Sequence, residues 1–319
     1  MAFRMDATRS SMAPMRHGIV LFTSDRGITP SVAAKAAEDN GFDTFYVPEH
    51  THIPTRRAAA HPGTGDESLP DDRYMRTLDP WVSLATAAAV TSRIRLATAV
   101  ALPVESDPIT LAKTIASLDH LSGGRVTVGA GFGWNTDELS DHRVPAGRRR
   151  TVLREYLDAM RALWNQEEAS YDGEFVSFGP SWAWPKPVQP QPPVLIGAGG
   201  GPKTFAWIAA NADGWITTPL EQDITGKVDA LHDNWRAAGR AGHPEIVVLA
   251  AVKPSAEDIA TWERIGVTEI IWGLPDKSED EVISFLGRHA RRLGLTSDEG
   301  AATAAEASAT GHAERSGSR

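Results

Sequence analysis

The chain has 319 residues, with 32 lysines and arginines against 41 aspartates and glutamates, giving a net charge of -9 at pH 7 with histidine neutral. This acidic balance disfavours nucleic acid and anionic membranes as partners, because both would repel the chain. There is no cysteine, which excludes disulfides and thiolate metal centres and fits a cytoplasmic location. The length suits either two domains or one large barrel.

Neither end of the chain has the composition of a folded element. The first sixteen residues carry scattered charges and lack the continuous apolar core of a signal peptide. No apolar run approaches the roughly 20 residues of a membrane span. The last residues are rich in Ala, Ser, Glu and Gly, so they cannot offset the entropy lost on ordering. We expect disordered segments over residues 1–14 and 296–319 and one folded domain over residues 15–295.

Predicted strands and helices alternate along the folded part. Apolar runs predict eight strands, at residues 17–22, 44–48, 94–102, 125–130, 194–196, 214–217, 246–252 and 269–272. Three helices open with a capping residue and a proline, at Thr29-Pro30, Asp79-Pro80 and Asp107-Pro108. Further helices are predicted at residues 151–164, 203–211, 224–238, 256–265 and 279–293.

This alternation over about 280 residues indicates an α/β fold of the (β/α)₈ type, the TIM barrel. A doubly wound open sheet is the alternative. Such a sheet usually has fewer strands and an early G-x-G-x-x-G fingerprint, and residues 23–27 after the first strand contain none. We therefore favour the barrel.

Two insertions interrupt the predicted barrel. Residues 51–78, after the second strand, form a long polar segment that is either a functional lid or disordered. We favour the lid, because the segment begins directly after His50. Before the fifth strand, residues 171–175 predict a small hairpin and residues 180–193 are rich in proline.

Catalytic groups of such barrels lie at the carboxyl ends of the strands. The second strand ends in Glu49 and His50, which are costly to bury without polar partners and are therefore candidate catalytic residues. A solvated loop that starts with a charged pair is the alternative. His50 and His52 also suggest a metal site, but only Asp276 follows as a further ligand, so we expect no metal.

Two glycine-rich loops follow the fourth and fifth strands. The loop at residues 197–202 precedes a helix, so its backbone N–H groups and the helix dipole could bind a phosphate. A flexible turn is the alternative. The glycines of residues 129–133 would let a flat ligand approach the backbone closely, although glycine-rich loops are common in barrels.

Six segments together resemble the bacterial luciferase-like superfamily, and within it the F420-dependent oxidoreductases. They are VPEHTHIP at residues 47–54, TLDP at 77–80, IRLATAV at 94–100, LDHLSGGR at 118–125, GAGFGWN at 129–135 and ADGW at 212–215. They occur in the family's order over nearly the whole folded part.

The resemblance implies a deazaflavin ring at the barrel mouth, against a bulge in the third strand whose Ala99-Val100 peptide bond is cis. It places His50 at the reactive edge of the ring and Glu49 beside it. The candidate cofactor-binding residues are Ala99, Val100, Gly131, Trp134, Asn135, Ala198, Gly199 and Gly200. The last three match the family's phosphate loop.

One position departs from the family's pattern. F420-dependent sugar-phosphate dehydrogenases carry a glutamate in the strand-four motif, where this chain has Trp134. The resemblance then implies that a second proton-handling carboxylate is missing and that the substrate is less polar than a sugar phosphate.

We expect an F420-dependent oxidoreductase that transfers a hydride between the cofactor and a small organic substrate, with His50 assisting proton transfer. The resemblance also implies a homodimer. Three alternatives remain: an FMN-dependent monooxygenase on the same barrel, a non-catalytic barrel that binds a flavin or deazaflavin, and a metal-dependent hydrolase.

Overall fold

The computed structural model describes residues 14–218, 220–250 and 253–296. Apart from residues 14 and 296, the N-terminal and C-terminal segments predicted to be disordered lie outside the described residues. The last two residues of the predicted seventh barrel strand, 251 and 252, also lie outside them.

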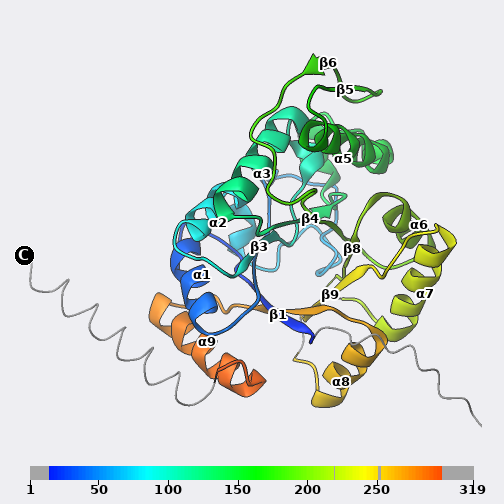
Figure 1. The fold of residues 1–319 in the computed structure, drawn as a ribbon. Helices are drawn as coiled ribbons and strands as arrows, with labels where there is room; N and C mark the ends of the chain where they lie inside the picture. The colour runs from blue at the N-terminus through cyan, green and yellow to red at the C-terminus, as the bar shows by residue number, and fades with distance from the viewer. Residues whose placement is uncertain (1–13, 219, 251–252, 297–319) are drawn as a thin grey trace, which may run out of the picture.

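Eight parallel strands close into a barrel, which confirms the predicted (β/α)₈ fold (Figure 1). They are β1 (Arg16–Val20), β2 (Thr44–Val47), β3 (Arg95–Thr98), β4 (Val126–Gly131), β7 (Val194–Gly197), β8 (Gly214–Ile216), β9 (Glu245–Ala250) and β10 (Glu269–Gly273). Each strand pairs with the next of these along the chain, and β1 closes the barrel against β10. Their carboxyl ends therefore meet at one mouth of the barrel.

Helices surround the barrel wall (Figure 1). They are α1 (Pro30–Asp39), α2 (Pro80–Ala88), α3 (Pro108–Ser122), α4 (Thr136–Asp141), α5 (Arg149–Asn165), α6 (Pro202–Asn211), α7 (Ile224–Ala237), α8 (Ala256–Ile265) and α9 (Glu279–Leu293). The side chains of Asp79 and Asp107 cap α2 and α3, as their positions before proline predict. At α1 the Thr29 side chain makes no capping hydrogen bond.

The helix α4 was not predicted. It has six residues, five of which are polar or charged, so it lacks the apolar period that identifies longer helices. Asn135 caps it by accepting a hydrogen bond from the backbone N–H of Glu138.

Two apolar layers hold the fold together. The inner layer fills the barrel with the buried side chains Tyr46, Ala97, Leu195, Ile216, Val247 and Ile271. The larger outer layer lies between strands and helices and includes Phe45, Leu84 and Leu153. At the amino ends of the strands, Arg16 donates to buried Glu269 at 3.0 Å. The interior of the barrel is thus filled with packed apolar side chains.

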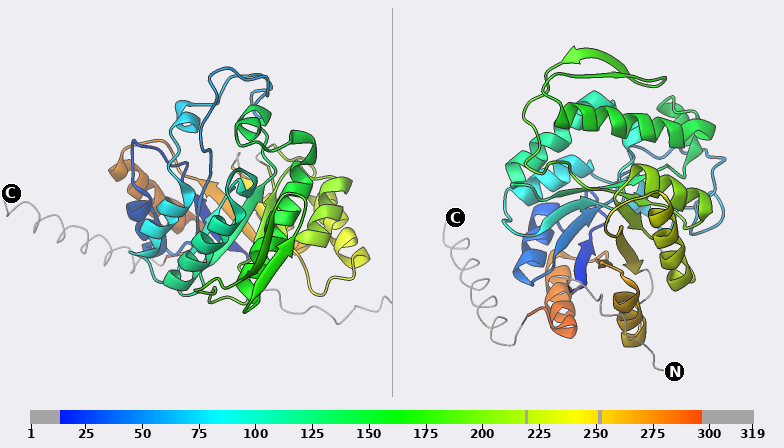
Figure 2. Two further views of the ribbon diagram at one scale, coloured as in Figure 1. Left: turned by 90° about the horizontal axis from the view of Figure 1, so that it is seen from above. Right: turned by 45° about the vertical axis from the view of Figure 1, so that its right-hand side comes forward.

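Both insertions are present. The hairpin of β5 (Ala169–Asp172) and β6 (Ser177–Ser181) is antiparallel, as predicted, and lies beside α5 (Figure 1). The segment between β2 and α2, drawn in blue to cyan, rises from one end of the barrel (Figure 2). It contains the 3₁₀ helix η1 (Asp72–Met75). The backbone N–H groups of Ala58 and Ala59 donate to Asp137 of α4 at 3.0 and 2.9 Å.

The third barrel strand is shorter than predicted. It ends at Thr98, and the Ala99-Val100 peptide bond that follows is cis, as the resemblance implied. Ala101 then pairs with Ala130 in an isolated bridge. No helix among the described residues is both long and apolar enough to cross a membrane.

Candidate active site

Glu49 connects the end of β2 to the chain that follows β3. Its carboxylate accepts a hydrogen bond from the Leu102 N–H at 2.5 Å, and its own N–H donates to the Val100 carbonyl at 3.1 Å. Burial raises the pKa of Glu49 to about 7. Glu49 is therefore placed to hold the backbone around Val100.

His50 is held by a carboxylate that the sequence analysis did not identify. Its Nδ1–H donates to Oε2 of Glu138 at 2.9 Å, and the two side chains are 7% and 0% exposed. Glu138 also accepts from the Thr51 N–H and from the Asn135 side-chain amide, at 3.1 and 3.3 Å. These donors suit an ionised carboxylate, which fixes the His50 tautomer and leaves the lone pair on Nε2.

A carboxylate therefore lies beside His50 although Trp134 stands at the position of the family's glutamate. Glu138 comes from α4, four residues beyond Trp134. The signal was present in the sequence, because Asn135 and Glu138 have the three-residue spacing of a helix cap and its partner. The helix was too short and too polar for its periodicity to reveal the cap.

A third carboxyl group lies beside this pair. Glu105, in the 3₁₀ helix η2 (Pro103–Glu105), is buried, and its Oε2 lies 3.4 Å from Oγ1 of Thr51. Burial and the charges of Glu138 and Glu49 raise the pKa of Glu105 to about 9. Near neutral pH Glu105 is therefore protonated, which spares the cluster a further negative charge.

Aromatic side chains from the segment after β2 and from the loop after β4 surround His50. The His50 ring lies 5.8 Å from Trp134 and 5.6 Å from Tyr74, measured between ring centroids. His61 packs edge-on against both, at 4.9 and 5.0 Å, and is buried. This close cover agrees with the lid interpretation of residues 51–78.

Val100, which follows β3, lies against Gly131 at the end of β4. A Cβ added at Gly131 would meet Val100 Cγ2 at 2.8 Å, and one added at Gly197 would meet Val100 Cγ1 at 2.3 Å. Val100 therefore packs directly on two glycines, of which Gly197 was not predicted. Asn135 was predicted to bind cofactor, but its side chain caps α4 and it is 2% exposed.

The loop after β7 is partly engaged by protein groups. The Gly200 N–H donates to Glu221 at 2.8 Å, and Glu221 pairs with Lys227. The Ala198 carbonyl accepts from the indole N–H of Trp215. A Cβ added at Gly199 would meet nothing within 4 Å, so a ligand can approach that backbone. The Gly199 backbone is thus open to a ligand, whereas the Gly200 N–H and Lys227 are engaged by Glu221.

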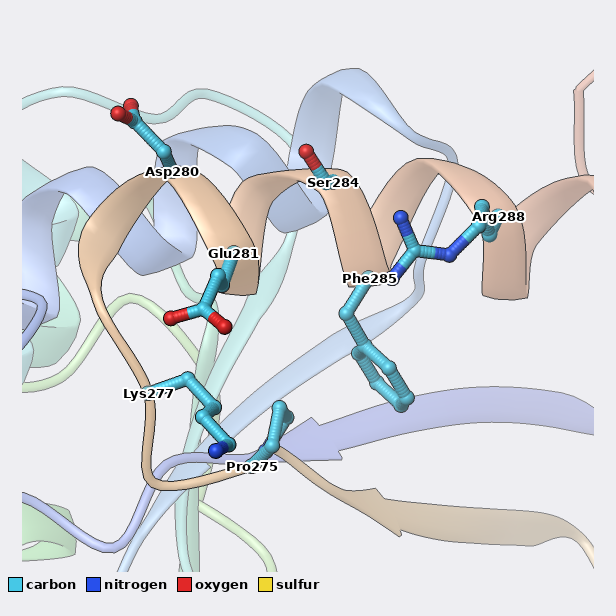
Figure 3. Close-up of a pocket in the computed structure, with 7 residues that line it drawn as sticks. All are labelled: Pro275, Lys277, Asp280, Glu281, Ser284, Phe285 and Arg288. Carbon is cyan, nitrogen blue, oxygen red and sulfur yellow. The ribbon is translucent and has the colours of Figure 1, made fainter.

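Two cavities lie outside the His50 cluster. One of about 260 Å³ lies at the ends of β8 and β9 and is lined by Thr217, Glu221 and Lys253 among others. The other, about 460 Å³, runs along α9 between Pro275 and Arg288 (Figure 3). It contains none of the predicted site residues. Among the described residues, no group of three or more His, Asp or Glu side chains could hold a metal ion.

Comparison with known proteins identifies the family. A model of the luciferase-like monooxygenase family matches residues 32–316. The chain therefore belongs to the luciferase-like monooxygenase family.

The relatives differ in cofactor. The uncharacterized protein Rv0953c of Mycobacterium tuberculosis is 70% identical over 88% of this chain and 99% of its own length. An F420-dependent glucose-6-phosphate dehydrogenase of Kineococcus radiotolerans is 29% identical over 65% of this chain and 58% of its own. An FMNH₂-dependent dimethylsulfone monooxygenase of Pseudomonas fluorescens is 26% identical over 66% of this chain and 56% of its own length.

Solved structures share the barrel. The monooxygenase RslO1 of Streptomyces bottropensis superposes with a TM-score of 0.60 at 26% identity, over 79% of this chain and 75% of its own. An F420-dependent secondary alcohol dehydrogenase gives a TM-score of 0.68 at 17% identity, over 86% of this chain and 98% of its own. The second similarity concerns the fold alone.

Proposed function

We propose that the protein is an F420-dependent oxidoreductase that transfers a hydride between the deazaflavin and an organic substrate. The observation that carries the proposal is the His50 imidazole, buried at the carboxyl end of β2 and held at Nδ1 by Glu138. Hydride transfer to or from a carbonyl carbon requires a proton at the adjacent oxygen, and a histidine with one free ring nitrogen can exchange it. The F420-dependent relative supports this choice of cofactor.

The cofactor would span the mouth of the barrel. Ala99, Val100 and Gly131 would support the ring, and the Gly199 backbone would meet the phosphate. When bound, F420 supplies or accepts the hydride.

The chain's own side chains orient and protonate the substrate. Nε2 of His50 accepts the proton of a substrate hydroxyl, or returns it in the reverse direction. Glu138 keeps the ring in place and stabilises its charged form. Trp134, His61 and Tyr74 exclude water from the same side of the mouth and favour a largely apolar substrate.

An FMN-dependent monooxygenase is the second candidate. The FMNH₂-dependent relative supports it, at an identity close to that of the F420-dependent one. In such an enzyme His50 and Glu138 would supply a proton after oxygen activation. The residues at the barrel mouth therefore fit both reactions and do not distinguish them.

Activity assays separate the two candidates. The purified protein is incubated with reduced F420 and a panel of apolar ketones, aldehydes and enones, and cofactor oxidation is followed by absorbance without oxygen. A parallel series supplies reduced FMN and records oxygen uptake above the uncatalysed rate. Turnover with F420 that falls in His50→Gln supports the proposal. Catalysed oxygen uptake with FMN and no turnover with F420 would replace it with the second candidate.

A further inference from the structure

A continuous row of polar groups leads from buried His50 to the protein surface. His50 Nδ1 lies 2.9 Å from Oε2 of Glu138, whose Oε1 lies 3.5 Å from Oγ1 of Thr51. The same Thr51 oxygen lies 2.7 Å from Nε2 of His142, a side chain that is 26% exposed. Every step is within hydrogen-bond reach, while His50 itself is almost fully buried.

We propose that Glu138, Thr51 and His142 form a proton relay that connects His50 with solvent. The inference rests on the proposed role of His50, since only a histidine that takes up protons needs to release them. The relay groups do not touch the substrate; they restore the protonation state of the residue that does.

The proton balance is closed at each step. After His50 has taken a proton at Nε2, it releases the one on Nδ1 to the Glu138 carboxylate and becomes neutral, with its remaining proton on Nε2. When the reaction runs in the reductive direction, Nε2 gives that proton to the substrate oxygen and the same row returns a proton to Nδ1, which restores the starting tautomer. Rotation of the carboxyl group presents that proton to Oγ1 of Thr51, which passes its own hydroxyl proton to Nε2 of His142. His142 then gives a proton to water, so one proton enters the row and one leaves it.

The surroundings suit this transfer. His142 must be neutral to accept a proton. Burial and the charge of His52 lower the pKa of His142, and they outweigh the charges of Glu138 and Asp141, which raise it. Glu105 faces Thr51 and His142 from η2, at 3.4 and 3.8 Å, and keeps its own proton. The other titratable groups around the row are Glu49 at the end of β2 and His61 and Tyr74 from the segment after β2.

Thr51 is the position on which the relay depends. A second branch leaves the same oxygen through His52, whose Nδ1 lies 3.0 Å away and whose Nε2 pairs with Asp141 at the surface. Both branches pass through Oγ1 of Thr51, so removal of this hydroxyl interrupts both. Thr51→Val removes it with little change of shape, and Thr51→Ser keeps it.

The test needs no cofactor, so failure of the relay is distinguishable from failure of the proposed function. Protein labelled with ¹⁵N-histidine is examined by NMR, His50→Gln assigns the Nδ1 proton of His50, and its exchange rate with water is measured. In Thr51→Val we expect exchange to slow by on the order of 10-fold or more. Thr51→Ser should exchange at the wild-type rate.

Two controls complete the experiment. An unchanged Nδ1 chemical shift in Thr51→Val shows that the bond to Glu138 persists, so slower exchange reflects the lost hydroxyl. If Thr51→Val does not fold, the double variant His52→Ala/His142→Ala replaces it, and added imidazole should restore exchange. Wild-type exchange rates in a folded variant that lacks both exits, or lacks the hydroxyl, would overturn the relay.

Discussion

At the scale of single residues, the site depends on the bond between His50 and Glu138. In Glu138→Gln the amide oxygen would keep the bond from the Thr51 N–H, so the NH2 group would face Nδ1, shift the ring proton to Nε2 and remove the base. We therefore expect Glu138→Gln to lower kcat/KM by about 10²- to 10⁴-fold while cofactor affinity is retained. Steady-state kinetics of Glu138→Gln beside Ser140→Ala, an exposed position on the same helix, measures this effect. Equal rates in the two variants would mean that the carboxylate has no part in proton transfer.

At the scale of elements, the approach of Val100 to the neighbouring strands shapes the mouth. A methyl group at Gly197 would meet Val100 Cγ1 at 2.3 Å, whereas one at Gly273, also at a strand end, meets nothing within 4 Å. Gly197→Ala should thus displace Val100 and weaken cofactor binding by on the order of 10-fold or more. Gly273→Ala should bind as the wild type does. Fluorescence titration compares them, and equal affinities would show that Val100 does not support the ring.

A second element-scale prediction concerns the connection of α1 to β3. The Glu38 carboxylate accepts from the backbone N–H groups of Ser92, Arg93 and Ile94, at distances of 2.7 to 3.2 Å. Glu38→Ala leaves these donors without their partner, so we expect a loss of roughly 2–4 kcal/mol in the free energy of unfolding. Denaturant unfolding measures it against Lys35→Ala, an exposed side chain on the same helix. If Glu38→Ala lost no more unfolding free energy than Lys35→Ala, the hydrogen bonds of Glu38 would not stabilise the connection of α1 to β3.

The elements also show how far the sequence could predict the structure. Strands and longer helices were predictable because their apolar residues repeat with a clear period, and Asp79 and Asp107 mark two starts. The helix α4 was not, since its only apolar residue is Leu139. Glu138 was not predictable either, because the approach of α4 to His50 is a tertiary contact that local patterns do not encode. The packing of Val100 on Gly197 is likewise a tertiary contact that the sequence does not reveal.

At the scale of the whole molecule, the buried carboxyl groups make stability depend on pH. The pKa values of Glu49 and Glu105 rise from about 4.5 to about 7 and about 9, chiefly through burial. A raised carboxyl pKa means that the folded protein holds a proton that the unfolded chain has lost. The contribution of these two groups to the free energy of unfolding is therefore complete below pH 4.5. It is lost as the pH rises through about 7 for Glu49 and about 9 for Glu105.

Glu105→Gln tests this dependence, because an amide cannot ionise. The free energy of unfolding, measured with urea at pH values between about 5 and 9, should fall less steeply in Glu105→Gln than in the wild type. Parallel curves for the two proteins would show that the folded state does not keep Glu105 protonated.

For the barrel as a whole, the central question is which cofactor binds at its mouth. Calorimetric titration of the purified protein with F420 and, separately, with FMN is the most direct test of the proposed function. We predict saturable binding of one F420 per chain, tighter than that of FMN and weakened in Gly197→Ala. Tighter binding of FMN, or no binding of either, would contradict the proposed function.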